Sequence, residues 1–524
     1  MPRLTPERLR KSQLTQVLRS LCATVLVASQ ALLPTPALAQ LQPFQTVLPG
    51  LGDGGEMTAS AERHLGDQIA RELYRDTDYI DDPVIAAYVQ DIWQRLLTAA
   101  RARGELTPEL DERFAWTILL GRDRNINAFA LPGGYLGLNL GLVAAVGSRD
   151  ELATVLGHEL SHVTQRHISR IMDKQGKQLP LMIAGLILGM IAAGRSRSGD
   201  AGQAVVMGSQ ALFMQSQLSF SRDMEREADR IGFGVMTQAG FAPQGAAAMF
   251  ERLQYASRLN DNGSFPYLRS HPLTTERISD MQGRFQFRMD AAPPVPLVMD
   301  HAMVASRARV LTRPGVDVLR LWIDAASSGE FAKSAPAQQA GMLYAAALSA
   351  KEMRDYKTAR ALAERLVVRT ADDKAAARQA RWLAAEIELA AGAAPKAVAL
   401  LDARSKERPE MLLSAEAATA MRQPAPMIPV LRDWVAANPR DATAWRALGN
   451  LYGAENDTLR AVRSDAEANV AILDYPAARD RFKAAQELVR QSKVIDHYEA
   501  SIIDTRARAV EALVKEQAAE PPLK

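Results

Sequence analysis

The feature that most constrains this chain is the stretch LGHELSHVTQRH at 156–167, which places His158 and His162 four residues apart with Glu159 between them. On a helix, residues four apart share one face, so both imidazoles can bind the same cation. Glu159 lies about 100° around the helix from His158 and can reach a water molecule beside that cation. The H-E-x-x-H pattern favours zinc, with the carboxylate as the general base of peptide hydrolysis.

The helix that carries this motif is expected to begin at a capping box. Ser148 and Glu151 form the pattern S-x-x-E directly before an apolar periodic run, and we expect one helix over about 150–172. Short apolar stretches predict a strand at 113–120 and two strands around a Pro-Gly-Gly turn within 125–143. Helical periodicity elsewhere makes the expected fold class mainly α with a small sheet, and the H-E-x-x-H motif makes the first domain an expected α+β domain of the zincin type.

Two histidines are too few for a zinc site, so a third protein ligand is expected. The spacing for a third histidine on the same helix is missed by one residue. SRDMEREAD at 221–229 offers a carboxylate instead. Glu225 and Asp229 are four apart, so Glu225 can bind the zinc while Asp229 accepts the free ring N–H of a ligand histidine. Glu227 is the competing choice, but it points off that face.

The first 39 residues predict an export signal. Basic residues are followed by an apolar run, and the small residues Ala37 and Ala39 precede Gln40, where we expect cleavage. The alternative is an uncleaved anchor helix. Loss of the leader lowers the net charge from +3 to −1, so the basic pI of 8.8 is no argument for nucleic-acid binding. The only cysteine, Cys22, lies in the leader, which excludes thiolate zinc ligands and disulfides from the mature chain.

After the Pro-rich AAPPVP stretch the chain becomes rich in alanine and helical in pattern. WRALGNLY at 445–452 matches the first helix of a tetratricopeptide repeat, and DYPAARDRFKAA at 474–485 resembles the matching second helix. Stretches at 355–366 and 394–403 resemble that second helix again, although an irregular helical bundle is the alternative. We therefore expect a signal peptide at 1–39, a zinc metallopeptidase domain at 40–290, a linker at 291–300, a tetratricopeptide solenoid at 301–514 and a tail at 515–524.

Four motifs together resemble the HtpX-like gluzincin peptidases: NAFALPGG at 127–134, ELATVLGHELSHVTQRH at 151–167, SRDMEREAD at 221–229 and SHPLTTERI at 270–278. With an export signal in front and repeats behind, nearly the whole mature chain resembles the periplasmic β-barrel assembly-enhancing proteases. The resemblance implies one zinc ion per chain, held by His158, His162 and Glu225. It also implies that Glu159 is the general base and that Asp229 supports catalysis from behind the ligands.

The same resemblance implies a location and partners. The location is the periplasm of a Gram-negative bacterium. The partners are unfolded substrates, outer-membrane β-barrel proteins and their assembly machinery, the last contacted through the repeats. Asn127, Ala128 and Phe129 would lie on an edge strand to which substrate adds as an extra strand.

Three further residues near the expected site have open or supporting roles. His271, in the loop SHPL, can fill the fourth zinc position and hold the enzyme off, stabilise the oxyanion of the transition state, or be structural. Arg277, on the helix expected to follow, is a candidate electrophile or a structural anchor. His167 is expected to support the motif helix rather than to bind metal.

The apolar segment 179–194 has 16 residues, fewer than the roughly 18 that indicate a membrane span. We expect a lid over the active site, or a peripheral contact with the outer membrane. Two functions follow from the whole sequence. One is a zinc endopeptidase that degrades misfolded or stalled outer-membrane proteins and assists their assembly. The other is a chaperone or scaffold that docks on the assembly machinery, with proteolysis minor or latent.

Overall fold

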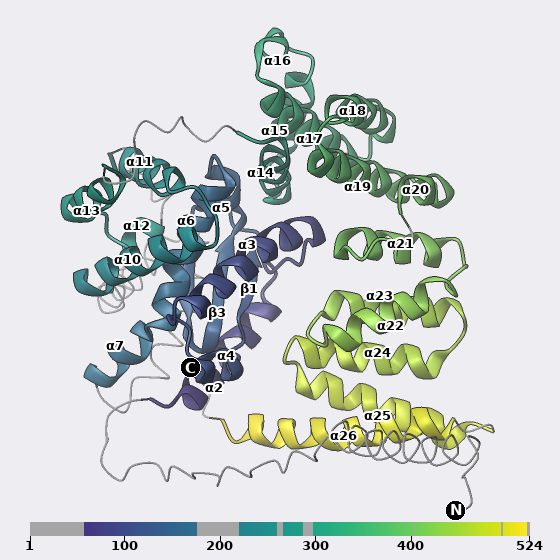
Figure 1. Cartoon of the computed structure of the whole chain (residues 1–524). Helices are drawn as coiled ribbons and strands as arrows, with labels where there is room; N and C mark the ends of the chain where they lie inside the picture. Colours follow the sequence, from purple (N-terminus) through teal and green to yellow (C-terminus); the bar gives the residue numbers. More distant parts are fainter. Residues whose placement is uncertain are drawn as a thin grey trace, which may run out of the picture. The chain divides into compact units, whose positions relative to one another are not determined.

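The computed structural model describes residues 57–175, 220–258, 266–286, 297–402, 404–493 and 496–520 (Figure 1). The predicted export signal, the apolar segment 179–194 and most of the predicted linker lie outside the described residues. Within the described ranges, no helix combines the length and the apolar character that crossing a membrane requires.

The region from α2 to α13, where a peptidase domain is predicted and which we call the peptidase region, surrounds one small sheet with helices (Figure 1). Its elements are α2 (Ala59–Arg75), α3 (Pro83–Ala102), α4 (Pro108–Arg113), β1 (Thr117–Gly121), β2 (Ala128–Leu131), η1 (Pro132–Gly134), β3 (Tyr135–Asn139), α5 (Leu140–Ala145), α6 (Arg149–Thr164), α7 (His167–Gln175), α10 (Arg222–Gln238), α11 (Gln244–Arg258), α12 (Tyr267–Ser270) and α13 (Thr275–Gln286). The strand order is β1-β3-β2, with β1 parallel and β2 antiparallel to β3. The predicted combination of a mainly helical domain with a small sheet is confirmed.

The motif helix α6 is an internal helix. Every residue from Glu151 to Thr164 is buried, and the helix packs against α3, β2, α10 and α11. The predicted cap is present, because the hydroxyl of Ser148 accepts the backbone N–H of Glu151 at 3.1 Å. A helix buried on all sides has no solvated face, so its polar side chains must find partners inside the protein.

Helices α6 and α10 cross at two glycines. A Cβ atom on Gly232 would lie 2.9 Å from the backbone of Gly157 and His158, and one on Gly157 would lie 3.2 Å from the carbonyl oxygen of Gly232. Glycine at both positions therefore allows the two backbones to approach closely. This crossing brings Glu225 and Asp229 beside the histidines of the motif.

The prediction of one helix over 150–172 is wrong at its centre. α6 ends at Thr164, and α7 begins at His167. Between them Arg166 has a φ of 52°, in the left-handed region that interrupts a helix. Its guanidinium pairs with Glu62 at 3.0 Å and donates to the backbone carbonyl of Met57. Contacts with a distant part of the chain thus stabilise a break that the local sequence does not announce.

The predicted strands need two smaller corrections. Residue 113 is still part of α4, and the first strand begins at Thr117. The second half of the predicted hairpin ends at Asn139, because residues 140–145 form α5. Between β2 and β3, Gly133 and Gly134 both have positive φ, which the predicted turn requires.

The C-terminal region is a helical solenoid in which successive helices stack on one another (Figure 1). Its helices are α14 (Met299–Leu311), α15 (Val316–Ala325), α16 (Gly329–Lys333), α17 (Pro336–Glu352), α18 (Tyr356–Arg369), α19 (Lys374–Ala390), α20 (Ala394–Leu400), α21 (Arg408–Ala420), α22 (Met427–Ala437), α23 (Ala442–Ala454), α24 (Thr458–Ala471), α25 (Tyr475–Gln491) and α26 (His497–Ala518). Their assignment to tetratricopeptide repeats stays a prediction.

One detail of the predicted repeats is wrong. The WRALGNLY helix is α23, and it packs against α24, whereas the stretch predicted to be its second helix is α25, which packs against α24 and α26. The last helix, α26, ends at Ala518, and the predicted boundary between repeats and tail at 514 stays a prediction. Beyond it, Glu520 pairs with Arg71 of α2 at 2.8 Å, so the predicted tail carries a tertiary contact.

A buried arginine joins the solenoid to the start of α3. Arg307 of α14 donates to both carboxylate oxygens of Asp82 at 2.8 and 2.7 Å. It also donates to Glu386 at 2.6 Å and to the hydroxyl of Tyr344 at 3.0 Å. Asp82 in turn accepts the N–H of Ile85 as the N-cap of α3. All the charges at this junction therefore have partners within the chain.

Candidate metal centre

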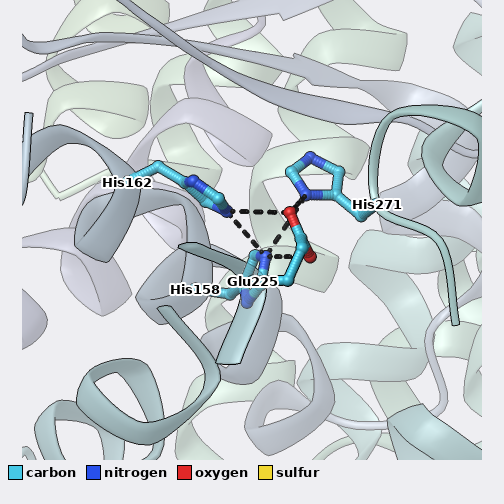
Figure 2. Close-up of side chains that lie close together, drawn as sticks. All are labelled: His158, His162, Glu225 and His271. Carbon is cyan, nitrogen blue, oxygen red and sulfur yellow. Dashed lines mark hydrogen bonds and ion pairs between the residues drawn. The ribbon is translucent and has the colours of Figure 1, made fainter. Parts of the chain in front are cut away.

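Four side chains converge on one point in the peptidase region (Figure 2). His158 and His162 come from α6, Glu225 comes from α10, and His271 follows α12. All four are buried, and their candidate ligand atoms lie within 4.8 Å of one another. The Nε2 atoms of His158 and His162 are 3.0 Å apart. The Glu225 oxygens lie 3.5 Å from the first Nε2 and 3.4 Å from the second.

The donor set of this cluster fits zinc. Imidazole nitrogens and a carboxylate oxygen are ligands that zinc takes in proteins. His158 donates from Nδ1 to the carboxylate of Asp229 at 2.9 Å, because a carboxylate can only accept. A neutral His158 then has its lone pair on Nε2, which faces the cluster. Several lone pairs that face one another at hydrogen-bond distance are the arrangement that a cation stabilises.

The pKa shifts of the cluster indicate a negative electrostatic potential at the point where the lone pairs converge. Burial opposes charge on His158, yet Asp229 and Glu225 raise its pKa to about 10. Burial and the neighbouring His158 hold the pKa of His162 well below its usual value. Burial alone would raise the pKa of Glu225, but His271 and His158 lower it well below the ordinary range. The carboxylates thus favour positive charge at this point, as a divalent cation would supply.

Glu159 lies beside the cluster and is fully buried. Its Oε2 accepts the backbone N–H of Ala130 in β2 at 2.9 Å, and its Oε1 lies 3.4 Å from Nε2 of His271. Burial raises the pKa of Glu159, although His271 and His158 oppose the shift. A carboxyl group with a raised pKa accepts a proton more readily, which suits a general base that must hold and release one.

Arg277 holds the carboxylates behind the cluster. Its Nε and Nη2 donate to the two oxygens of Asp229 at 2.7 and 2.8 Å, and its Nη1 donates to the carbonyl oxygen of Pro272 at 2.9 Å. Nη1 also lies 2.7 Å from Glu225 Oε2. Because each nitrogen of the guanidinium faces one of these acceptors, the geometry favours the anchor over the electrophile. Burial opposes ionisation of Asp229, but Arg277 and His158 lower its pKa.

His271 lies inside the cluster rather than at its edge. Its Nδ1 is 2.9 Å from Glu225 Oε1 and 3.3 Å from His158 Nε2. Its ring stacks with that of Tyr267, at a centroid distance of 4.7 Å, and with that of Phe220, at 5.5 Å. These contacts hold the imidazole where Nδ1 can act as a further ligand. The sequence indicated this residue, but it gave no sign of the two aromatic rings.

The edge strand β2, where two of the predicted substrate-binding residues lie, borders Glu159. β2 is an edge strand, in which Ala128 and Phe129 pair with Leu138 and Gly137 of β3. Asn127 precedes the strand, and its carbonyl oxygen accepts the N–H of Asn139. β2 also packs against α6, where Ala130 holds Glu159.

Sequence reasoning missed how His162 is held. Its Nδ1 lies 2.9 Å from Nδ1 of His167, and Nε2 of His167 lies 3.0 Å from Oε2 of Glu227. Glu227, the competing choice for a ligand, contacts His167 and Arg170 instead of the cluster. The clue in the sequence was a third histidine shortly after the motif, but its use depends on the break at Arg166.

Comparison with known proteins identifies the family. Residues 85–285 match the model of Peptidase family M48. The β-barrel assembly-enhancing protease of Yersinia pestis is 30% identical over 417 residues, which are 78% of this chain and 81% of that protein. The chain belongs to the β-barrel assembly-enhancing protease family. The member from Escherichia coli K12 is 29% identical over 473 residues, covering 88% of this chain and 91% of its own length.

A further relative matches over a shorter stretch. A protein of Vibrio cholerae is 35% identical over 289 residues, which span 54% of this chain and about half (55%) of that protein. The M48 match covers α6, α10 and His271 together. The protein is therefore a zinc metalloprotease, and the predictions of an enzyme and of its zinc cofactor are confirmed.

Proposed function

We propose that this protein is a zinc-dependent endopeptidase of the periplasm that degrades misfolded or stalled outer-membrane proteins and assists their assembly. The observation that carries the proposal is the convergence of four buried ligand residues beside the buried carboxylate of Glu159. The relatives named for β-barrel assembly support the substrate class. The predicted export signal supports the compartment.

His158, His162 and Glu225 would hold the metal, one ion per chain. When bound there, zinc supplies a Lewis acid that polarises the scissile carbonyl and makes water a stronger acid. Glu159 takes the proton of the attacking water and delivers it to the leaving amine. Asp229 keeps His158 in the tautomer with a free Nε2, and Arg277 holds Asp229 in place.

The edge strand β2 supports a mode of substrate binding. A polypeptide that adds to β2 as an extra strand uses main-chain hydrogen bonds, which tolerate many sequences. Asn127, Ala128 and Phe129 would contact it. Because Ala130 of the same strand holds Glu159, a strand added at this edge lies next to the base.

Glu159→Gln is the experiment that tests the proposed catalytic site. The amide keeps the size of the side chain and leaves all the proposed ligands, but it cannot act as a base. We expect cleavage of an unfolded outer-membrane β-barrel protein to fall roughly 10²–10⁴-fold while the zinc content stays at one per chain. Glu72→Gln, which changes a half-buried carboxylate on α2, is the matched control and should cleave like the wild type. Undiminished cleavage by zinc-loaded Glu159→Gln would overturn the proposal.

We also propose that His271 is a fourth ligand that holds the enzyme off. The short distances from its Nδ1 to Glu225 and His158 support this role over a purely structural one. His271→Ala should then cleave an unfolded substrate faster than the wild type. Slower cleavage at unchanged zinc content would support the oxyanion role instead.

A groove between the solenoid and the peptidase region favours a second function. A cavity of about 940 Å³ is lined by Trp116, Trp382 and Trp434 together with Arg378 and Arg408. Such a surface suits the docking of a polypeptide of the assembly machinery, as in the scaffold function. Glu159→Gln separates the two functions in a Gram-negative strain that lacks this protein. If the variant restores β-barrel assembly fully, scaffolding is the main function.

A further inference from the structure

A line of contacts runs from the metal cluster to the protein surface through His162. Nδ1 of His162 lies 2.9 Å from Nδ1 of His167, and Nε2 of His167 lies 3.0 Å from Oε2 of Glu227. The His167 side chain is 0% exposed, whereas the Glu227 side chain is 30% exposed. Three side chains from α6, α7 and α10 therefore connect the interior of the site to solvent.

The protonation of these groups determines which atom donates in each hydrogen bond from His162 to His167 and from His167 to Glu227. An ionised carboxylate only accepts, so Nε2 of His167 must donate to Glu227. Full burial favours the neutral imidazole, which then has its lone pair on Nδ1 and can only accept there. His162 must consequently donate from its own Nδ1. Its remaining lone pair is then on Nε2, the atom that faces His158 and Glu225.

We propose that His167 is a positioning residue that holds His162 in the tautomer able to bind the cation, and that Glu227 fixes the tautomer of His167 in turn. The inference rests on the proposed zinc site, because it concerns how one ligand of that site is prepared. His167 itself touches neither substrate nor metal in this role.

The break between α6 and α7 explains how His167 reaches this position. On one continuous helix, a residue five positions after His162 would lie about 140° around the axis and point away from it. The positive φ of Arg166 interrupts the helix and starts α7 at His167 in a new direction. The two rings then meet nearly edge to face, with centroids 4.9 Å apart and an interplanar angle of 77°.

The two histidines of the motif are thus supported differently. His158 donates directly to Asp229, a buried carboxylate that Arg277 neutralises. His162 donates to a neutral ring and reaches a carboxylate only through it. Asp229 fixes the tautomer of His158, and His167 fixes that of His162. Only the support of His162 depends on a partly exposed residue, Glu227.

The first test measures zinc affinity of the full mature chain by competition with a chelator of known affinity. His167→Phe keeps a ring but removes the acceptor, and we expect zinc affinity to fall about 10–100-fold. His167→Gln offers an amide oxygen to His162 and an N–H to Glu227, so its affinity should return to within a few-fold of the wild type. Arg170→Ala is the control, since Arg170 contacts the same Glu227 oxygen at 2.9 Å but lies outside the line.

The second test reads the tautomers directly and needs no variant at His167. The chain has seven histidines, so histidine-selective ¹⁵N labelling gives a resolvable set of ring signals. In the zinc-loaded protein we expect the His162 proton on Nδ1 and the His167 proton on Nε2. A His167 proton on Nδ1 would overturn the inference, whether or not His167→Phe folds.

His162→Ala separates this inference from the proposed function. If His162→Ala binds zinc as tightly as the wild type, the proposed zinc site itself is wrong. If His162→Ala loses zinc while folded His167→Phe binds it with wild-type affinity, only the role of His167 is wrong.

Discussion

The junction around Arg307 and the cluster around Glu225 are buried to the same degree, with Arg307 4% and Glu225 2% exposed. At the junction, the donors of Arg307 meet acceptors of Asp82, Glu386 and Tyr344. In the cluster, two imidazole lone pairs and the carboxylate of Glu225 face one another instead. The junction pairs its charges with groups of the chain, whereas the cluster brings imidazole and carboxylate acceptors together with one guanidinium, that of Arg277, beside Glu225.

This difference shows what marks a functional site among buried polar groups. Buried charges are usually paired because an unpaired one costs several kcal/mol, so burial and ionic character by themselves indicate structure. Acceptors that converge without an equal number of donors indicate a bound cation. This criterion supports Arg307 as an anchor and Glu225 as the proposed ligand, although both lie in dense ionic networks.

The largest effect is expected from a change within the cluster. Glu225→Gln replaces the proposed carboxylate ligand by a neutral amide of the same size. We expect the purified variant to lose zinc and to show no cleavage above background, while unfolding of the metal-free protein changes little because Arg277 keeps Asp229. Atomic absorption measures the zinc content, and an assay with an unfolded β-barrel protein measures the cleavage. The control Glu276→Gln, which changes an exposed carboxylate, should keep its zinc and its cleavage activity. If Glu225→Gln also kept its zinc and its cleavage activity, Glu225 would not be a ligand.

The next effect concerns stability rather than activity. Asp82→Ala leaves Arg307 buried with one carboxylate partner instead of two and also removes the N-cap of α3. We expect a loss of about 3 kcal/mol in the free energy of unfolding, measured by urea titration, at unchanged zinc content. Asp82→Asn keeps an acceptor for the cap and should be less destabilising than alanine by about 1 kcal/mol. A junction variant as stable as the wild type would mean that the pairing at Arg307 is not structural.

The pH dependence of the same pair gives an independent check. Burial would raise the pKa of Asp82, but Arg307 outweighs burial and holds it below the ordinary value of 3.8. A lowered pKa contributes stability that is fully present above about pH 4 and is lost as the pH falls through the folded-state value. The gap in unfolding free energy between wild type and Asp82→Asn should therefore be constant from about pH 7 to pH 5 and narrow below about pH 4. A gap that widened on acidification would contradict the ion pair.

The sequence predicts the cluster better than the junction, and the reason is distance along the chain. His158, Glu159 and His162 follow from the geometry of one helix, and Glu225 follows from the need for a third ligand. Arg307 and Asp82 are 225 residues apart, and neither belongs to a recognisable pattern. Their meeting depends on how the solenoid packs on α3, which no local rule contains.

Within the site, the unpredicted parts depend on backbone that departs from its local preference. The helix of the motif was expected to continue to 172, but Arg166 adopts a positive φ that residues other than glycine seldom take. That break brings His167 to His162. The aromatic stacking of His271 likewise depends on Phe220, which lies far earlier in the chain, and on Tyr267 of the short helix α12 just before it. Periodicity identifies ligands on one helix, but it does not identify what supports them from another.

The smallest expected effect comes from an ion pair at the surface and fixes the scale for the others. Arg284 and Asp280 are four apart on α13 with a contact of 2.9 Å, and their side chains are 30% and 43% exposed. Arg284→Ala should cost no more than about 0.5 kcal/mol in urea titration, because water screens the pair and holding two long side chains costs entropy. The charges and the distance resemble those of Arg307 and Asp82, so burial is the main variable. If Arg284→Ala lowered the free energy of unfolding as much as Asp82→Ala does, burial would not determine how much an ion pair stabilises this protein. The contrast between the buried junction and the surface would then be wrong.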